Sequence, residues 1–166
     1  MKSKQKNQIA SINLLLSIVT IAIVYFLQYA LGMQPCEMCL NERYPYFVLI
    51  ILSLCFLISQ QILERNKDKI HVIILYIGLV AIVFGFFYTL MHVGIERGLI
   101  EGFTECSGSF LNINDNNDLL LALENAPLIR CDEPVILLNF ISIAESNLIM
   151  MGILLFINVY LLLFVK

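Results

Sequence analysis

Residues 70–91 read IHVIILYIGLVAIVFGFFYTLM, a stretch without a single Asp, Glu, Lys or Arg. A helix needs about 20 predominantly apolar residues to cross the roughly 30 Å hydrocarbon layer of a bilayer. Three further stretches approach or exceed this length without an internal charge, and they cover residues 9–31, 46–62 and 148–165. The apolar runs are continuous and do not alternate, which excludes a β-barrel. The sequence therefore predicts an all-α membrane protein, a four-transmembrane-helix bundle in which residues 1–166 form one domain.

The composition agrees with a membrane location. Hydrophobic residues make up 60% of the 166 residues and charged residues only 14%, and the mean hydropathy is +0.86. Soluble domains contain roughly half apolar and about a quarter charged residues. Soluble classes are therefore excluded, including nucleic-acid-binding proteins, which need a basic surface.

The distribution of Lys and Arg predicts which way the helices face, because cytoplasmic loops carry more of these residues. Seven of the ten lie in the N-terminal tail, in the 64–69 turn and at the C-terminus, whereas the other two loops hold Arg43, Arg97 and Arg130. We therefore expect both termini in the cytoplasm. The outer side then carries a short loop, residues 32–44, and a long one, residues 92–147.

The short loop contains Cys36-Glu37-Met38-Cys39, a C-x-x-C motif. This spacing suits a redox-active dithiol, in which one cysteine is often reactive as the thiolate. If a helix begins just after Cys39, its N-terminus and the Arg43 cation one turn further on both favour the thiolate there. The thiolate is the form that attacks a disulfide or an electron-poor cofactor.

Other interpretations of the five cysteines are weaker or stay open. No second close pair or finger-spaced histidine accompanies the motif, so no metal site is predicted, and Leu40 rules out the haem-attachment motif C-x-x-C-H. A structural disulfide in an exported loop remains possible for Cys36 and Cys39, and it is the simpler interpretation of Cys106 and Cys131 taken alone. Two pairs on one face can instead exchange electrons. Cys55, inside a span, is expected to be inert.

The sequence resembles the disulfide bond formation protein B (DsbB) family of bacterial inner-membrane thiol:quinone oxidoreductases. The stretch Pro35-Cys36-Glu37-Met38-Cys39-Leu40 followed by Glu42-Arg43 is similar to the family signature P-C-x-x-C-x-x-E-R. The similarity continues through 92–96 (HVGIE), Cys106, 131–133 (CDE), and 142–144 (SIA) with Asn147. It spans almost the whole chain.

The resemblance implies a catalytic role for Cys36, Cys39, Cys106 and Cys131. Cys106 would form a mixed disulfide with a soluble periplasmic DsbA-like thiol oxidase, with Cys131 as its partner in the loop. Electrons would then pass to Cys36 and Cys39, and from Cys39 to a membrane quinone, ubiquinone or menaquinone. Arg43 would stabilise the thiolate and the reduced quinone, and His92 would line the same pocket.

Simpler interpretations remain for several of these residues. The alternative for Arg43 is a snorkelling cation, that for His92 is an interfacial residue without a partner, and that for Tyr44 and Tyr46 is the interfacial aromatic belt. The whole chain could be a non-enzymatic membrane protein with structurally stapled outer loops. A vitamin K epoxide reductase-like thiol/quinone enzyme is a further alternative, but there the C-x-x-C belongs near the last helix.

Overall fold

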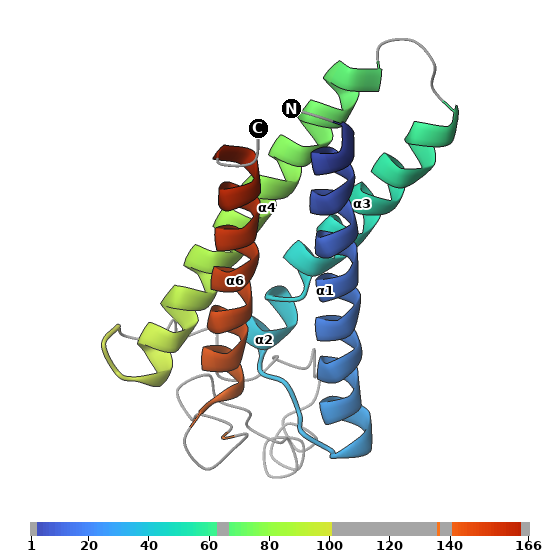
Figure 1. The fold of residues 1–166 in the computed structure, drawn as a ribbon. Helices are drawn as coiled ribbons and strands as arrows, with labels where there is room; N and C mark the ends of the chain where they lie inside the picture. Colours follow the sequence, from blue (N-terminus) through green and yellow to red (C-terminus); the bar gives the residue numbers. More distant parts are fainter. Residues whose placement is uncertain (1–2, 63–66, 101–135, 137–140, 164–166) are drawn as a thin grey trace, which may run out of the picture.

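The computed structural model describes residues 3–62, 67–100, 136 and 141–163, and all structural statements concern these residues. Four of its helices are long and apolar enough to cross a membrane, which confirms the predicted all-α four-helix membrane bundle. Both termini lie at one end of the bundle and the short helix α2 at the other (Figure 1). The helices are α1 (Ser3–Ala30), α2 (Glu37–Asn41), α3 (Tyr44–Ile62), α4 (Lys67–Glu96) and α6 (Ile143–Leu163).

The predicted long loop, 92–147, was too long at its start, because α4 continues to Glu96. A glycine ends the helix: Gly98 adopts a positive φ of 67°. The Gly98 N–H donates to the Ile95 carbonyl at 3.0 Å, and the Leu99 N–H donates to the Gly94 carbonyl at 2.8 Å. This is a Schellman cap. Its position keeps His92 inside the last turns of α4.

The same loop was predicted too long at its other end, since α6 begins at Ile143. Ser142 and Glu145 form a capping box: the Glu145 N–H donates to Ser142 Oγ, and the Ser142 N–H donates to a Glu145 carboxylate oxygen, both at 3.0 Å. The S-x-x-E pattern that forms such a box is visible in the sequence. The hydropathy of the span gave no sign of it, because the first turn of α6 contains charged and polar residues.

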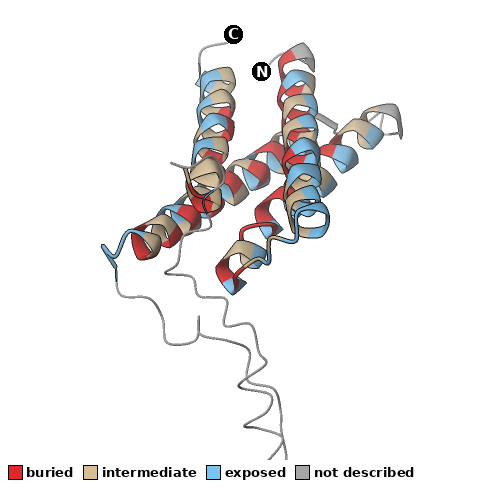
Figure 2. Ribbon diagram, turned by 90° about the horizontal axis from the view of Figure 1, so that it is seen from below, coloured by how far each residue is buried: buried red, intermediate tan, exposed pale blue. Residues whose placement is uncertain are grey.

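The side chains that hold the bundle together lie between α1, α3, α4 and α6. α1 packs mainly against α3, and α4 packs against both α3 and α6. Buried positions face the interior of the bundle and exposed positions face outward (Figure 2). The largest central cluster of buried side chains contains Tyr46, Leu49, Ile82, Met151 and Leu154.

The outward faces of the long helices are apolar as well. In each membrane-spanning window at most 39% of the residues are buried inside the protein, and large side chains such as Phe84, Phe87 and Phe156 are more than half exposed. Helices that are hydrophobic all round belong in an apolar environment, here the lipid. The interior instead holds polar contacts such as the reciprocal amide pair of Asn13 and Asn158, at 3.0 and 2.8 Å.

Candidate active site at the α2 end of the bundle

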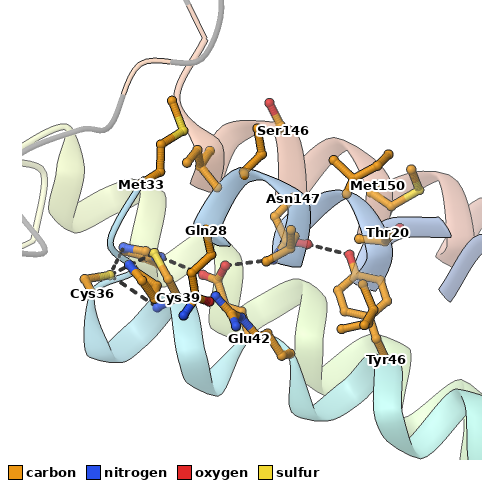
Figure 3. A pocket seen from close by; sticks show the side chains of 18 of the residues that line it. Thr20, Gln28, Met33, Cys36, Cys39, Glu42, Tyr46, Ser146, Asn147 and Met150 are labelled. Atoms are coloured by element: carbon orange, nitrogen blue, oxygen red, sulfur yellow. Dashed lines mark hydrogen bonds and ion pairs between the residues drawn. The ribbon is translucent and has the colours of Figure 1, made fainter. Parts of the chain in front are cut away.

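Two free thiols lie at the start of α2 (Figure 3). Cys36 is the N-cap residue of this helix, in an extended conformation, and its sulfur accepts a hydrogen bond from the Cys39 backbone N–H at 3.2 Å. The two sulfurs are 2.9 Å apart. The condition that a helix begins just after Cys39 is not met, because α2 begins at Glu37. The helix N-terminus therefore acts on Cys36, and Cys39 lies inside the helix.

Cys36 is buried, with 6% of its surface exposed. The hydrogen bond with the Cys39 thiol and the burial of the sulfur raise the pKa of the Cys36 thiol above its ordinary value. Cys36 therefore holds its proton more tightly than a free cysteine does, and its oxidation is helped by a group that accepts this proton.

That group is present on α4. His92 is fully buried, and its Nε2 lies 3.6 Å from the Cys36 sulfur. Its Nδ1 lies 2.6 Å from a carboxylate oxygen of Glu42. A carboxylate accepts hydrogen bonds, so Nδ1 carries a hydrogen; whenever the ring is neutral, Nε2 then turns its lone pair to the thiol. Cysteine, histidine and glutamate thus form a continuous chain of contacts.

Glu42 is itself fixed by α6. Its second carboxylate oxygen accepts a hydrogen bond from the Asn147 amide at 2.7 Å (Figure 3). The same amide approaches Thr89 Oγ1 at 3.3 Å, and the Asn147 carbonyl oxygen accepts a hydrogen bond from the Tyr46 hydroxyl. Tyr46 is only 2% exposed, so its assignment to the interfacial belt was wrong. Tyr44, which is 66% exposed, fits that assignment.

A cavity of about 200 Å³ lies beside the dithiol, and its walls are largely apolar. Residues of α1, α3 and α6 line it, together with Cys36, Cys39 and His92. Arg43 is 7% exposed, and its guanidinium stands 5.1 Å from the centre of the Tyr25 ring. Two buried atoms of the cavity lining, Arg43 Nε and Gln28 Oε1, have no hydrogen-bond partner within the described part of the chain.

Buried polar atoms almost always have partners. An unpartnered donor and an unpartnered acceptor in one apolar cavity therefore point to a ligand with polar groups on an apolar body. A quinone has that chemistry: its carbonyl oxygens accept hydrogen bonds, and the hydroxyl groups of its reduced form donate them. The residues present fit such a molecule.

The structure thus brings together four of the residues singled out by the sequence, namely Cys36, Cys39, Arg43 and His92. Cys106 and Cys131 lie outside the described residues. Cys55 is exposed on α3. Sequence reasoning gave no role to Glu42, Asn147 or Gln28. Glu42 stood in the quoted signature and Asn147 in the quoted start of the last span, but only the fold reveals their contacts.

The fold and this site define a class, the multi-pass membrane proteins that carry a C-x-x-C dithiol at one end of a four-helix bundle. Residues 6–161 match the family "Disulfide bond formation protein DsbB", and the chain belongs to this family. It is also similar to the uncharacterized protein RP370 of Rickettsia prowazekii (strain Madrid E). The two are 30% identical over 152 residues, which cover 88% of this chain and 83% of that protein. No solved structure matches the chain significantly.

Proposed function

We propose that this membrane protein of the disulfide bond formation family is a thiol:quinone oxidoreductase. It oxidises a soluble periplasmic DsbA-like thiol oxidase and passes the electrons to a membrane quinone, ubiquinone or menaquinone. One observation carries the proposal: the Cys36–Cys39 dithiol shares its apolar cavity with the unpartnered atoms Arg43 Nε and Gln28 Oε1. Apolar walls suit a ligand that enters from the bilayer.

The proposed location is the bacterial inner membrane, with both termini in the cytoplasm and the dithiol on the periplasmic side. The excess of Lys and Arg in the tails and in the 64–69 turn supports this orientation. It places the dithiol in the compartment where disulfides form and persist.

The electrons follow two exchanges between cysteine pairs. The partner's dithiol attacks a Cys106–Cys131 disulfide, and the resulting dithiol attacks a Cys36–Cys39 disulfide. Each exchange breaks one S–S bond, forms another and moves two electrons. The last step closes the Cys36–Cys39 bond again.

A bound quinone supplies an acceptor for two electrons and two protons. Closing the Cys36–Cys39 bond requires that Cys36 lose its proton, and His92 Nε2, at 3.6 Å, is placed to accept it. Glu42 holds the imidazole in the required tautomer and stabilises its protonated form through the 2.6 Å contact at Nδ1. Arg43 stabilises negative charge that develops in the cavity, and the apolar walls strengthen this effect.

The proposal is tested with purified protein, a reduced DsbA-like partner and a soluble quinone analogue. Quinone reduction, followed by absorbance, and loss of partner thiols should run at one quinone per two thiols. Cys39→Ser should abolish both, and Cys55→Ser should leave both unchanged. Partner oxidation without quinone consumption would show that another acceptor is used.

A second variant tests whether the loop cysteines Cys106 and Cys131 take part in electron transfer. Cys106→Ser should stop oxidation of the partner, while a chemically reduced Cys36–Cys39 pair should still be oxidised by quinone. If Cys106→Ser oxidises the partner at the normal rate, Cys106 and Cys131 are structural and the proposed relay is wrong.

A further inference from the structure

Three ligand atoms of the kind that bind soft metal ions converge at the dithiol. Cys36 Sγ, Cys39 Sγ and His92 Nε2 all lie within 4.8 Å of one another. We propose that the reduced site binds a thiophilic divalent cation of the Zn²⁺ type through these three atoms, and that oxidation of the dithiol releases it. This goes beyond the proposed function, since the binding follows from the ligand set whichever electron acceptor the protein uses.

The spacing of the ligand atoms suits a tetrahedral ion. Zn–S bonds of about 2.3 Å and Zn–N bonds of about 2.0 Å place sulfur and nitrogen roughly 3.6 Å apart and two sulfurs roughly 3.8 Å apart. Cys36 Sγ and His92 Nε2 already stand 3.6 Å apart. The two sulfurs, at 2.9 Å, must separate by about 1 Å, which a small side-chain rotation supplies.

The histidine is already oriented as a ligand. Metal-binding histidines usually donate their second ring N–H to a carboxylate or carbonyl, which fixes the ring and makes the ligating nitrogen more basic. His92 has this partner in Glu42, 2.6 Å from Nδ1. Asn147, 2.7 Å from the other carboxylate oxygen, holds Glu42 in turn. The ligating histidine, the carboxylate that orients it and the amide that holds the carboxylate are therefore all in place.

The charges around the cluster also balance. Two thiolates neutralise a divalent cation, and the carboxylate of Glu42 is offset by the guanidinium of its neighbour Arg43, which is also buried. Binding exchanges two thiol protons for one metal ion and moves no electrons. Two cysteines and one histidine leave a fourth position, as in zinc sites of the alcohol dehydrogenase type, and the adjoining cavity can supply a water molecule there.

Binding must depend on the redox state. In the oxidised protein both sulfurs belong to a disulfide, so His92 is the one ligand of the three that remains. A cation bound to the reduced site coordinates both thiolates, and this coordination opposes closure of the Cys36–Cys39 bond. Zn²⁺ in the surrounding compartment would therefore inhibit turnover by holding the dithiol reduced.

The test uses full-length protein carrying Cys55→Ser, Cys106→Ser and Cys131→Ser, so that the C-x-x-C thiols are the only ones present. Co²⁺ is added to the reduced and to the oxidised form without oxygen, and Zn²⁺ affinity is measured by competition with a chromogenic chelator. We expect one ion per reduced chain, with thiolate-to-cobalt charge-transfer bands and tetrahedral d–d bands, and no such spectrum for the oxidised form.

The variants identify the ligands. Cys36→Ser or Cys39→Ser should abolish tight binding, and Glu42→Gln should weaken it about 10- to 100-fold while the thiolate bands remain. His92→Gln should weaken it further, and His92→Cys should restore tight binding with a stronger charge-transfer band, which separates ligand loss from misfolding. Equal binding by both redox states, or binding indifferent to His92, would overturn the proposal. Quinone reduction is assayed separately, so metal binding without it would count against the proposed function alone, and the reverse result against this inference alone.

Discussion

Arg43 is a buried cation whose Nε has no partner among the described side chains. The Tyr25 ring, 5.1 Å away, holds the guanidinium beside the cavity. We expect Arg43→Gln to raise the quinone KM or lower turnover about tenfold to a thousandfold, the range typical for loss of one charge that stabilises a reaction. Arg43→Lys should be milder, because it keeps the charge and loses the planar fork.

Arg97 offers a matched control for this measurement. It is a surface arginine, 59% exposed, and pairs with Glu145. Exposed ion pairs contribute roughly 0–1 kcal/mol, so Arg97→Gln should leave quinone kinetics close to the parent values. Unchanged kinetics in Arg43→Gln as well would mean that Arg43 only contributes to packing against Tyr25 and has no role in quinone reduction.

Cys36 gives a prediction about pH. The Cys39 thiol and burial raise the pKa of the Cys36 thiol, so at a given pH less of it is thiolate than in a free cysteine. Alkylation of Cys36 in the reduced protein should therefore be slower than that of glutathione and should keep accelerating above the pH at which glutathione levels off. Peptide mass spectrometry resolves the rate for this residue. A profile that levels off at or below the glutathione pH would contradict the raised pKa.

The contact between α6 and the site can be tested at Asn147. Asn147→Leu removes the donor to Glu42 and the acceptor for the Tyr46 hydroxyl. Each buried polar group left without a partner costs about 1–3 kcal/mol. We expect lower thermal stability together with a large loss of turnover, because Glu42 no longer holds His92.

Asn158 provides the control on the same helix. It pairs with Asn13 in the middle of the bundle and does not line the cavity. Asn158→Leu leaves the donor and the acceptor of the buried Asn13 amide without their partners, so it should lower stability about as much as Asn147→Leu does. It should nevertheless spare turnover. Equal turnover losses in the two variants would assign Asn147 to bundle packing alone.

The long helices could be predicted from sequence because a single physical quantity, the length of an uncharged apolar run, decides them. α2 could not, since five residues are too few for any periodicity. Because α2 begins at Glu37, Cys36 caps it, whereas the sequence pattern had suggested Cys39 at the helix N-terminus. The contacts within the site could not be predicted from the sequence either, because their residues are far apart along the chain. Glu42 and His92 are 50 residues apart, and Glu42 and Asn147 are 105 residues apart. The capping box at Ser142 and Glu145 is a local signal that the hydropathy of the span concealed.

For the molecule as a whole, the bundle separates two ends. The termini lie at one end and α2 at the other (Figure 1), and the dithiol belongs to the start of α2. One experiment on sidedness therefore decides whether the site can meet a periplasmic partner. Native Cys36 is a poor reporter for it, because this residue is buried. Glu37, its exposed neighbour at the first position of α2, is a better one.

In a background with all five cysteines replaced by serine, we expect Glu37→Cys to react with a membrane-impermeant thiol reagent in intact spheroplasts. Lys2→Cys, in the N-terminal segment, should react only after lysis. The physical reason is the excess of Lys and Arg in the tails and in the 64–69 turn, seven of ten in the whole chain. Gel-shift labelling before and after lysis measures both. If the two variants exchange their patterns, the dithiol faces the cytoplasm, and oxidation of a periplasmic partner is no longer a possible function of this site.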